Sequence, residues 1–231
     1  MSKTDTNSIK AVVFDMAGTT VDEGKTVYRC VKEAIARFGY EYSLEEVMGQ
    51  IGGMNKKEGI RLLMSASGEV SEEVVSGAFE LFRNKVEEVY STDHDIKEKI
   101  GATDLFRFLK EREIKVVLDT GYYRSTADIL IDRMDWENEN LIDYSVTSDE
   151  VAKGRPEPLM IQKMVDHFEL GNADKVIKVG DTRSDIEEGH NAGCCAVVGI
   201  SSDMYSCQDL LDMGATHAID ELDELKEIIT A

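Results

Sequence analysis

Basic residues are scarce in this sequence. Its 231 residues include 46 Asp and Glu but only 26 Lys and Arg, so the formal net charge is −20. Such a surface repels nucleic-acid phosphates and anionic lipid headgroups, and neither is expected as a partner. An anionic small substrate would need positive charge gathered locally at its site. Elsewhere the acid excess serves solubility.

Cysteines and long apolar runs are also few. The four cysteines form no Cys-x-x-Cys pair and no metal-site spacing: Cys30, Cys194, Cys195 and Cys207. We expect buried, reduced thiols in a cytoplasmic protein. No apolar run approaches the roughly 20 residues of a membrane span. Residues 1–10 are polar and lack the apolar stretch of a signal peptide.

Short apolar runs alternate with segments of helical periodicity along most of the chain. Four runs are predicted to be buried strands of a parallel sheet: 12–14, 114–118, 176–179 and 196–200. Three helical segments lie between them: 102–112, 126–134 and 159–168. This alternation predicts a doubly wound, Rossmann-like α/β fold with helices on both faces of the sheet.

Residues from about 25 to 90 interrupt that alternation. They contain no convincing strand but three or four amphipathic helical stretches, two of which begin in capping-box-like patterns at Ser43 and Asn55. We therefore predict an α/β core made of residues 1–22 and 96–231. An all-helical cap domain, residues 23–95, would be inserted after the first strand.

Polar clusters directly follow three of the predicted strands. They begin at Asp15, Asp119 and Gly180. The C-terminal ends of parallel strands lie along one edge of a sheet, where ligands of open α/β folds bind. Although the clusters are far apart in the sequence, we expect them to meet in one crevice.

These clusters resemble the motifs of the haloacid dehalogenase superfamily, whose first motif is Asp-x-Asp-Gly-Thr after a strand. The run Gly180-Asp181-Thr182-x-x-Asp185 matches the last motif closely. Within the superfamily, the chain is most similar to the phosphonoacetaldehyde hydrolases, or phosphonatases, and their phosphonatase-like relatives. The segments that carry the likeness are 14–22, 120–122, 154–158, 178–185, 188–189 and 191–193.

The resemblance implies a magnesium-dependent hydrolase that passes a phosphoryl group through a covalent aspartyl intermediate. Asp15 would be the nucleophile, which splits one hard displacement into two easier ones. Mg²⁺ prefers oxygen ligands and offsets the repulsion between a carboxylate and a phosphoryl group. The resemblance assigns it to Asp15, the Ala17 carbonyl and Asp181. Asp185 would either bind the ion directly or hold one of its ligands.

The resemblance also assigns the groups that bind the substrate. Thr120 and the Gly121 amide would hold phosphoryl oxygens at a helix N-terminus, and Tyr122 matches a residue of the phosphonatase site. Arg155 would add a fixed positive charge whose fork can grip two oxygens. Lys153 is a nearby rival for that role.

Two features indicate the phosphonatase branch. Ala17 stands where most phosphatases of the superfamily have a second Asp, which protonates the departing alcohol. Lys56 follows Gly53 in a Gly-x-x-Lys setting similar to that of the phosphonatase cap lysine. That lysine condenses with the substrate aldehyde, and the protonated Schiff base receives the electrons of the breaking carbon–phosphorus bond. In this route no leaving oxygen needs a proton, so a catalytic lysine at position 56 accounts for the absence of an acid at Ala17. Lys57 is the alternative candidate for the Schiff-base lysine.

Two positions depart from the phosphonatase pattern. Lys25 replaces a Cys that lines the site, and Gly59 replaces a His three residues beyond the Schiff-base lysine. A related aldehyde or a phosphate ester therefore stays open as the substrate, and so does a phosphate monoester phosphatase of the phosphoglycolate type.

A phospho-accepting signalling domain is a third interpretation, because it also pairs a strand-end Asp with Mg²⁺. It should lack the cap and carry its acidic ligands beside the first Asp, not at Asp181. The expected partner is a small phosphorylated or phosphonate substrate, with no nucleic acid and no membrane. A homodimer is left open.

Overall fold

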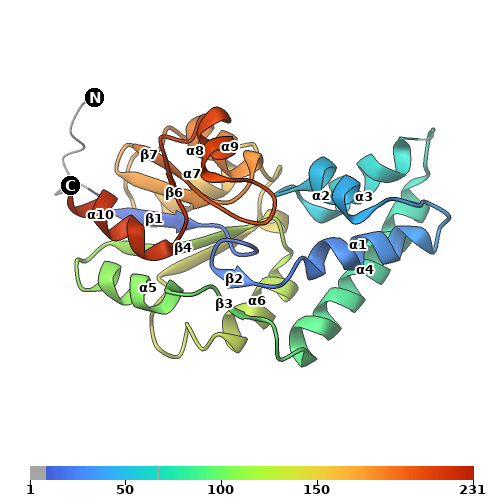
Figure 1. The fold of residues 1–231 in the computed structure, drawn as a ribbon, viewed down its shortest axis with the longest axis horizontal. Helices are drawn as coiled ribbons and strands as arrows, with labels where there is room; N and C mark the ends of the chain where they lie inside the picture. Colours follow the sequence, from blue (N-terminus) through green and yellow to red (C-terminus); the bar gives the residue numbers. More distant parts are fainter. Residues whose placement is uncertain (1–8, 67) are drawn as a thin grey trace.

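A parallel sheet forms the centre of the computed structural model, which describes residues 9–66 and 68–231 (Figure 1). Within these residues the sheet has six strands in the order β5-β4-β1-β6-β7-β8, all paired in parallel. The strands are β1 (Ala11–Phe14), β4 (Lys115–Thr120), β5 (Tyr144–Thr147), β6 (Val176–Gly180), β7 (Ala196–Ile200) and β8 (His217–Ile219). The four predicted strands are confirmed as β1, β4, β6 and β7.

Helices cover both faces of the sheet, because the central strands carry apolar residues on both sides. Val12 and Phe14 pack in one core with residues of α5, α6 and α10. Ala11 and Val13 point the other way, as strand geometry requires, and pack with α7. The helices of this part are α5 (Ala102–Lys110), α6 (Arg124–Arg133), α7 (Leu159–His167), α8 (Arg183–Ala192), α9 (Cys207–Asp212) and α10 (Leu225–Thr230). The predicted doubly wound fold is confirmed.

The two edge strands are not predicted from the sequence. β5 and β8 pair with a neighbour on one side only. Both are partly exposed, so neither needs the long apolar run by which the buried strands are recognised. Two 3₁₀ turns, η2 (Ser148–Glu150) and η3 (Leu222–Glu224), complete the core.

Among the described residues, four helices lie between residues 23 and 96 and form a group at the side of the core (Figure 1). They are α1 (Thr26–Ala36), α2 (Leu44–Ile51), α3 (Lys56–Ser65) and α4 (Glu72–Thr92). The capping box predicted at Ser43 is present, and the Asn55 side chain accepts hydrogen bonds from the backbone N–H groups of Lys57 and Glu58. We call these four helices the cap.

The chain enters and leaves the cap through a two-stranded antiparallel ribbon. Its strands are β2 (Val21–Asp22) and β3 (Lys97–Glu98). They coincide with the predicted boundaries between core and cap, which stay a prediction. The α4 helix also contacts α6 of the core, where Ser125 and Thr126 donate hydrogen bonds to Glu87.

The cysteines and the apolar segments can be compared with the expectations from composition. Cys30 is buried, but the other three cysteines are only partly buried, so the expectation of four buried thiols was wrong for them; all four are free. Across residues 9–66 and 68–231, no helix combines the length and apolarity of a membrane span. The signal-peptide expectation for residues 1–10 rests mainly on residues 1–8, which lie outside the described range.

Candidate active site

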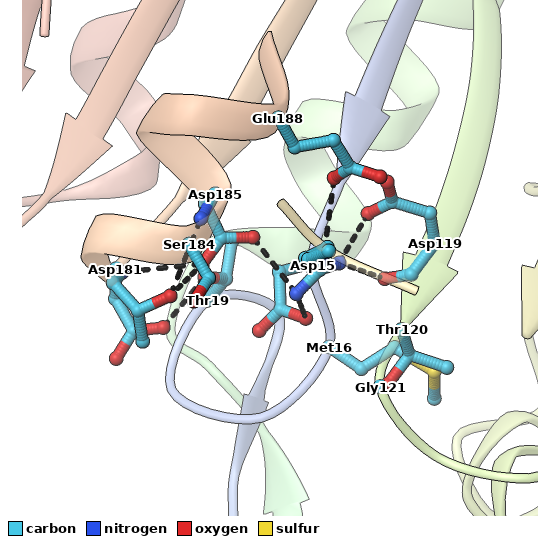
Figure 2. Close-up of polar contacts among 12 residues, drawn as sticks. Asp15, Met16, Thr19, Asp119, Thr120, Gly121, Asp181, Ser184, Asp185 and Glu188 are labelled. Atoms are coloured by element: carbon cyan, nitrogen blue, oxygen red, sulfur yellow. Dashed lines mark hydrogen bonds and ion pairs between the residues drawn. The ribbon is translucent and has the colours of Figure 1, made fainter. Parts of the chain in front are cut away.

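The C-terminal ends of β1, β4 and β6 bring the three predicted polar clusters to one edge of the sheet. β1 lies between β4 and β6. Asp15, directly after β1, therefore lies between Asp119 near the end of β4 and Asp181 after β6 (Figure 2). All three side chains are buried. The expected crevice thus contains residues from widely separated parts of the chain.

Arg155 lies at the centre of this cluster, and its side chain is 1% exposed. Its Nη1 atom is 2.6 Å from Asp15 Oδ1 and 2.9 Å from Asp185 Oδ1. Its Nε donates to Glu188 Oε2 at 2.9 Å, and its Nη2 donates to the Asp119 carbonyl at 2.8 Å and to the Asp119 carboxylate. The planar guanidinium thus connects Asp15 to three further carboxylates.

Lys178 is a second buried cation in the cluster and was missed as a site residue. It lies within β6 and is fully buried. Its Nζ contacts Asp119, and lies 3.2 Å from Asp185 Oδ1 and 3.1 Å from Glu188 Oε2. A lysine inside an apolar strand was the available signal, since buried lysines are almost always paired.

Asp119 and Glu188 respond differently to their burial. Burial would raise the pKa of Asp119, but Arg155 and Lys178 lower it to about 2. Burial raises the pKa of Glu188 to about 8, with help from the charge of Asp119. Asp119 therefore stays ionised, whereas Glu188 holds a proton more readily.

Carboxylates outnumber the cations that contact them at this edge. Arg155 and Lys178 contact Asp15, Asp119, Asp185 and Glu188, and the buried Asp181 adds another carboxylate. Burial raises the pKa of Asp15 to about 6 despite Arg155. Burial, together with the charges of Asp15 and Asp185, also raises that of Asp181. A divalent cation held by carboxylate oxygens would relieve this excess, and Mg²⁺ prefers such donors. The residues present therefore fit the ion.

The tightest carboxylate group among the described residues differs from the predicted metal set. Ligand atoms of Asp15, Asp119 and Asp185 lie within 4.8 Å of one another. Arg155 and Lys178 already contact these oxygens. Asp181 is not in this group and receives a weak hydrogen bond of 3.4 Å from Thr19. The group around Asp119 is thus best described as an ion-pair cluster.

Thr120 and Gly121 lie beside Asp15, but not at a helix N-terminus. The α6 helix begins at Arg124, so both residues belong to the end of β4 and the loop that follows. The expectation of a helix terminus there was wrong. The Thr120 hydroxyl accepts a hydrogen bond of 3.2 Å from the Tyr122 N–H, which fixes the turn of this loop.

A small cavity of about 20 Å³ lies between core and cap, which we call the inner cavity. By this measure it has room for about one water molecule. The core contributes Asp15, Ala17, Thr120, Gly121, Tyr122, Arg155 and Thr182, and the cap contributes Val27, Tyr28, Gly53 and Lys56. Every predicted catalytic and substrate-binding residue therefore lines this one cavity.

The cap loop before α3 closes directly onto the core. Ser184 Oγ donates to the Gly52 carbonyl at 3.1 Å, and Asn55 Nδ2 donates to Ser148 Oγ at 2.8 Å. A Cβ atom on Gly121 would lie only 2.8 Å from the Met54 carbonyl oxygen. Gly121 is therefore needed for the close approach of the two backbones.

Lys56 is the cap residue that carries a cation into the inner cavity. It is the first residue of α3 and is 5% exposed. Its Nζ donates to the Met54 carbonyl at 2.8 Å. Burial lowers its pKa from 10.5 to about 8, and Arg155 contributes, whereas Asp15 opposes the change. The neutral amine is therefore more accessible near neutral pH than it is in an exposed lysine.

The rival lysines point elsewhere. Lys57 forms an ion pair of 2.9 Å with Glu72 on the outer side of the cap. The Lys153 side chain is 71% exposed and lies 3.9 Å from Glu157. Neither lines the inner cavity.

The structure shows the neighbours of Lys25 and Gly59, the two positions that depart from the phosphonatase pattern. Lys25 forms an ion pair of 2.9 Å with Asp203 and lines a larger outer pocket of about 560 Å³, which also borders Ala17, Glu23 and Asp181. At Gly59, an added Cβ would lie 2.9 Å from the Cβ of Ile51. A histidine at that position would push α3 away from α2.

Known proteins resemble this chain in sequence over most of its length. A family model described as haloacid dehalogenase-like hydrolase matches residues 12–198. The phosphonoacetaldehyde hydrolase of Bordetella pertussis is 34% identical over 205 residues, which cover 82% of this chain and 71% of that protein. A phosphorylated carbohydrates phosphatase of Thermotoga maritima is 26% identical over 228 residues, covering 96% of this chain and 100% of that one.

A solved structure shares both the core and the cap. The phosphonoacetaldehyde hydrolase-like protein of Oleispira antarctica matches with a TM-score of 0.84 at 25% identity. The match covers 96% of this chain and 92% of that chain.

Proposed function

The chain belongs to the haloacid dehalogenase-like hydrolases, and from this membership we propose that it cleaves a carbon–phosphorus bond in a small phosphonate aldehyde. Lys56 would form a Schiff base with the aldehyde, and Asp15 would accept the phosphoryl group. The observation that carries the proposal is the position of Lys56, whose side chain is buried across the inner cavity from Asp15.

The identity of residue 17 supports this reading. Ala17 lines the inner cavity and offers no acidic side chain to a leaving group. In an ester hydrolysis the missing general acid would cost about 10²–10⁴-fold in rate. In the Schiff-base route the imine takes up the electrons of the breaking bond, so the loss is small. Phosphonoacetaldehyde is the first substrate to test, because it is the compound named for the Bordetella pertussis relative.

The roles of the remaining residues follow from their contacts. Arg155 holds Asp15 in place and offers its charge to the incoming phosphoryl oxygens. Thr120 and Gly121 would orient those oxygens from the end of β4. The cap loop excludes bulk water, which strengthens these interactions.

Magnesium is the expected cofactor, because haloacid dehalogenase-like hydrolases generally use it and the carboxylates fit it. Asp15, the Ala17 carbonyl, Asp181 and Asp185 would hold the ion. When bound, it supplies positive charge that offsets the repulsion between a carboxylate and a phosphoryl group.

Lys56→Ala is the variant that tests the Schiff base, with Lys57→Ala as its matched control. Borohydride should trap phosphonoacetaldehyde on the wild type, and peptide mass spectrometry should place the adduct on Lys56. We expect Lys56→Ala to lose both the adduct and at least about 10²-fold in turnover, and Lys57→Ala to keep both. Normal turnover of the Lys56→Ala variant on the best substrate found would refute the proposal.

A phosphate monoester phosphatase is the second candidate. The Thermotoga maritima relative, named for phosphorylated carbohydrates, aligns over 96% of this chain. In that case the enzyme works without the usual acid, so Ala17→Asp should make release of phosphate from an ester faster. A screen of phosphonoacetaldehyde against phosphate esters, including phosphoglycolate, separates the two candidates.

A further inference from the structure

A buried chain of three hydrogen-bonded side chains ends at the inner cavity. Tyr90 on α4 donates its hydroxyl hydrogen to Glu23 Oε2 at 3.0 Å. The Tyr90 and Tyr122 hydroxyl oxygens are 2.5 Å apart, and Tyr122 lines the inner cavity. Glu23 is 6% exposed, and both tyrosines are also buried. These hydrogen bonds therefore join the loop between β2 and α1, the cap and the core.

The hydrogen bonds in this chain have only one consistent direction while Glu23 is ionised. A carboxylate only accepts, and a tyrosine hydroxyl has a single hydrogen to donate. Since Tyr90 gives its hydrogen to Glu23, Tyr122 must donate to Tyr90. The Tyr122 oxygen can then offer only lone pairs to a further partner. It is thereby set to accept a proton from the cavity.

We propose that Glu23 is a positioning residue and proton acceptor for the aldehyde chemistry at Lys56, acting through the chain Glu23–Tyr90–Tyr122. This inference rests on the proposed function. It assigns roles to Glu23 and Tyr90, neither of which is a candidate site residue in the sequence analysis.

The proton transfers balance without any further reactant. The Lys56 ammonium gives a proton to the Tyr122 oxygen, directly or through one water in the inner cavity. Tyr122 passes its own proton to Tyr90, and Tyr90 passes its own to Glu23. The neutral amine then attacks the carbonyl carbon, and the C=O electrons move to oxygen. That oxygen takes one proton from the attached nitrogen and a second one back along the hydrogen-bonded side chains from Glu23, and it leaves as water. The nitrogen lone pair then forms the C=N bond of the protonated Schiff base, which keeps one hydrogen on nitrogen.

The surroundings of Glu23 favour its taking up a proton. Burial raises the pKa of Glu23, although the hydrogen bonds from Val27 and Tyr90 and the charge of Lys56 lower it in part. Five titratable groups interact electrostatically with Glu23: Tyr28 and Cys30 on α1, Lys56 on α3, Tyr90 on α4 and Tyr122 after β4. Glu23 also lines the outer pocket, which gives its proton a route to bulk solvent.

Glu23 has a second role that the test must separate. Its Oε2 atom accepts from the backbone N–H of Val27 at 2.7 Å and so caps α1. A glutamine can still accept both hydrogen bonds through its amide oxygen, but it cannot take up a proton. Glu23→Gln therefore keeps the hydrogen bond to the Val27 N–H and the direction of the tyrosine hydrogen bonds, but it removes the proton acceptor.

The first measurement is the rate of Schiff-base formation, by borohydride quench of a single turnover with phosphonoacetaldehyde. We expect Glu23→Gln and Tyr90→Phe each to slow it by about 10²-fold. The double variant should be no slower than either single one, because both break one chain. Hydrolysis of p-nitrophenyl phosphate, which needs no amine, and the unfolding temperature should stay near the wild-type values.

Tyr42→Phe is the matched control for Tyr90→Phe. Tyr42 also donates a hydroxyl hydrogen within the cap, to the Leu63 carbonyl at 2.6 Å, but it lies outside the chain. This variant should form the Schiff base at the wild-type rate. In Glu23→Ala, added formate should restore part of the lost rate, because the outer pocket can admit a small carboxylate.

The outcomes separate this inference from the function on which it rests. A wild type that does not act on phosphonoacetaldehyde or a related aldehyde overturns both. If the wild type is active and both Glu23→Gln and Tyr90→Phe form the Schiff base normally, only the inference fails. A loss that extends equally to p-nitrophenyl phosphate or to the unfolding temperature would show that Glu23 is merely structural and would also overturn it.

Discussion

At the scale of single residues, Arg155 and burial have opposite effects on the pKa of Asp15. Arg155 stabilises its charged form, and burial disfavours it. Asp15→Asn keeps the size and one acceptor oxygen but removes the nucleophilic charge. We expect turnover to fall below about 1% of wild type, because Asp15 is the one carboxylate among the described residues that lines the inner cavity. Phosphate release measures this, circular dichroism checks the fold, and activity above a few per cent would exclude Asp15 as the nucleophile.

Lys56 allows a prediction about pH. A lysine reacts with aldehydes only as the neutral amine, and burial lowers the pKa of Lys56 to about 8. Its labelling by formaldehyde and cyanoborohydride should therefore rise as the pH increases through about 8, and be lost below it. An ordinary lysine has a pKa of about 10.4. Peptide mass spectrometry at a series of pH values gives the midpoint; a midpoint above 10 would mean that burial does not act as described.

At the scale of elements, α2 and α3 contain two glycines in contrasting positions. An added Cβ at Gly59 would lie 2.9 Å from the Ile51 Cβ, whereas at Gly49 it would meet no atom within 4 Å. Alanine favours a helix over glycine by about 1 kcal/mol. Gly49→Ala should therefore raise the unfolding temperature. Gly59→Ala should lower it, because overpacking costs about 1–3 kcal/mol. Equal effects of the two variants would contradict the close packing of α2 on α3.

The whole molecule carries a charge of −20, and part of this excess is buried at the site. A bound Mg²⁺ should therefore stabilise the folded chain, by about 2.7 kcal/mol at a hundred times its dissociation constant. The unfolding temperature should rise with Mg²⁺ and fall on chelation. Asp181→Asn should remove most of this response. The matched control is Asp203→Asn, whose side chain is 78% exposed, and it should leave the response unchanged. The same rise in Asp181→Asn as in wild type would exclude Asp181 as a ligand.

The sequence by itself determined the central strands, the cap helices and the edge of the sheet at which the polar clusters gather. Buried parallel strands need apolar runs on both faces, and such runs are visible in residues 12–14 and 196–200. The polar residues that follow these runs must lie at one edge of the sheet. Asp15, Asp181 and Arg155 could therefore be proposed as candidate site residues from pattern and resemblance alone.

Only the tertiary structure decided which side chains meet. Lys56 and Lys57 are adjacent in the sequence, but the start of α3 turns Lys56 into the inner cavity and Lys57 toward Glu72. Lys178 likewise contacts Asp119, and Tyr90 contacts Glu23, across about 60 residues of sequence or more. Hydrogen bonds and pKa values depend on distance and burial in space, which a periodic pattern does not encode. Edge strands such as β5 escape detection for a related reason, since a half-exposed strand needs no apolar run.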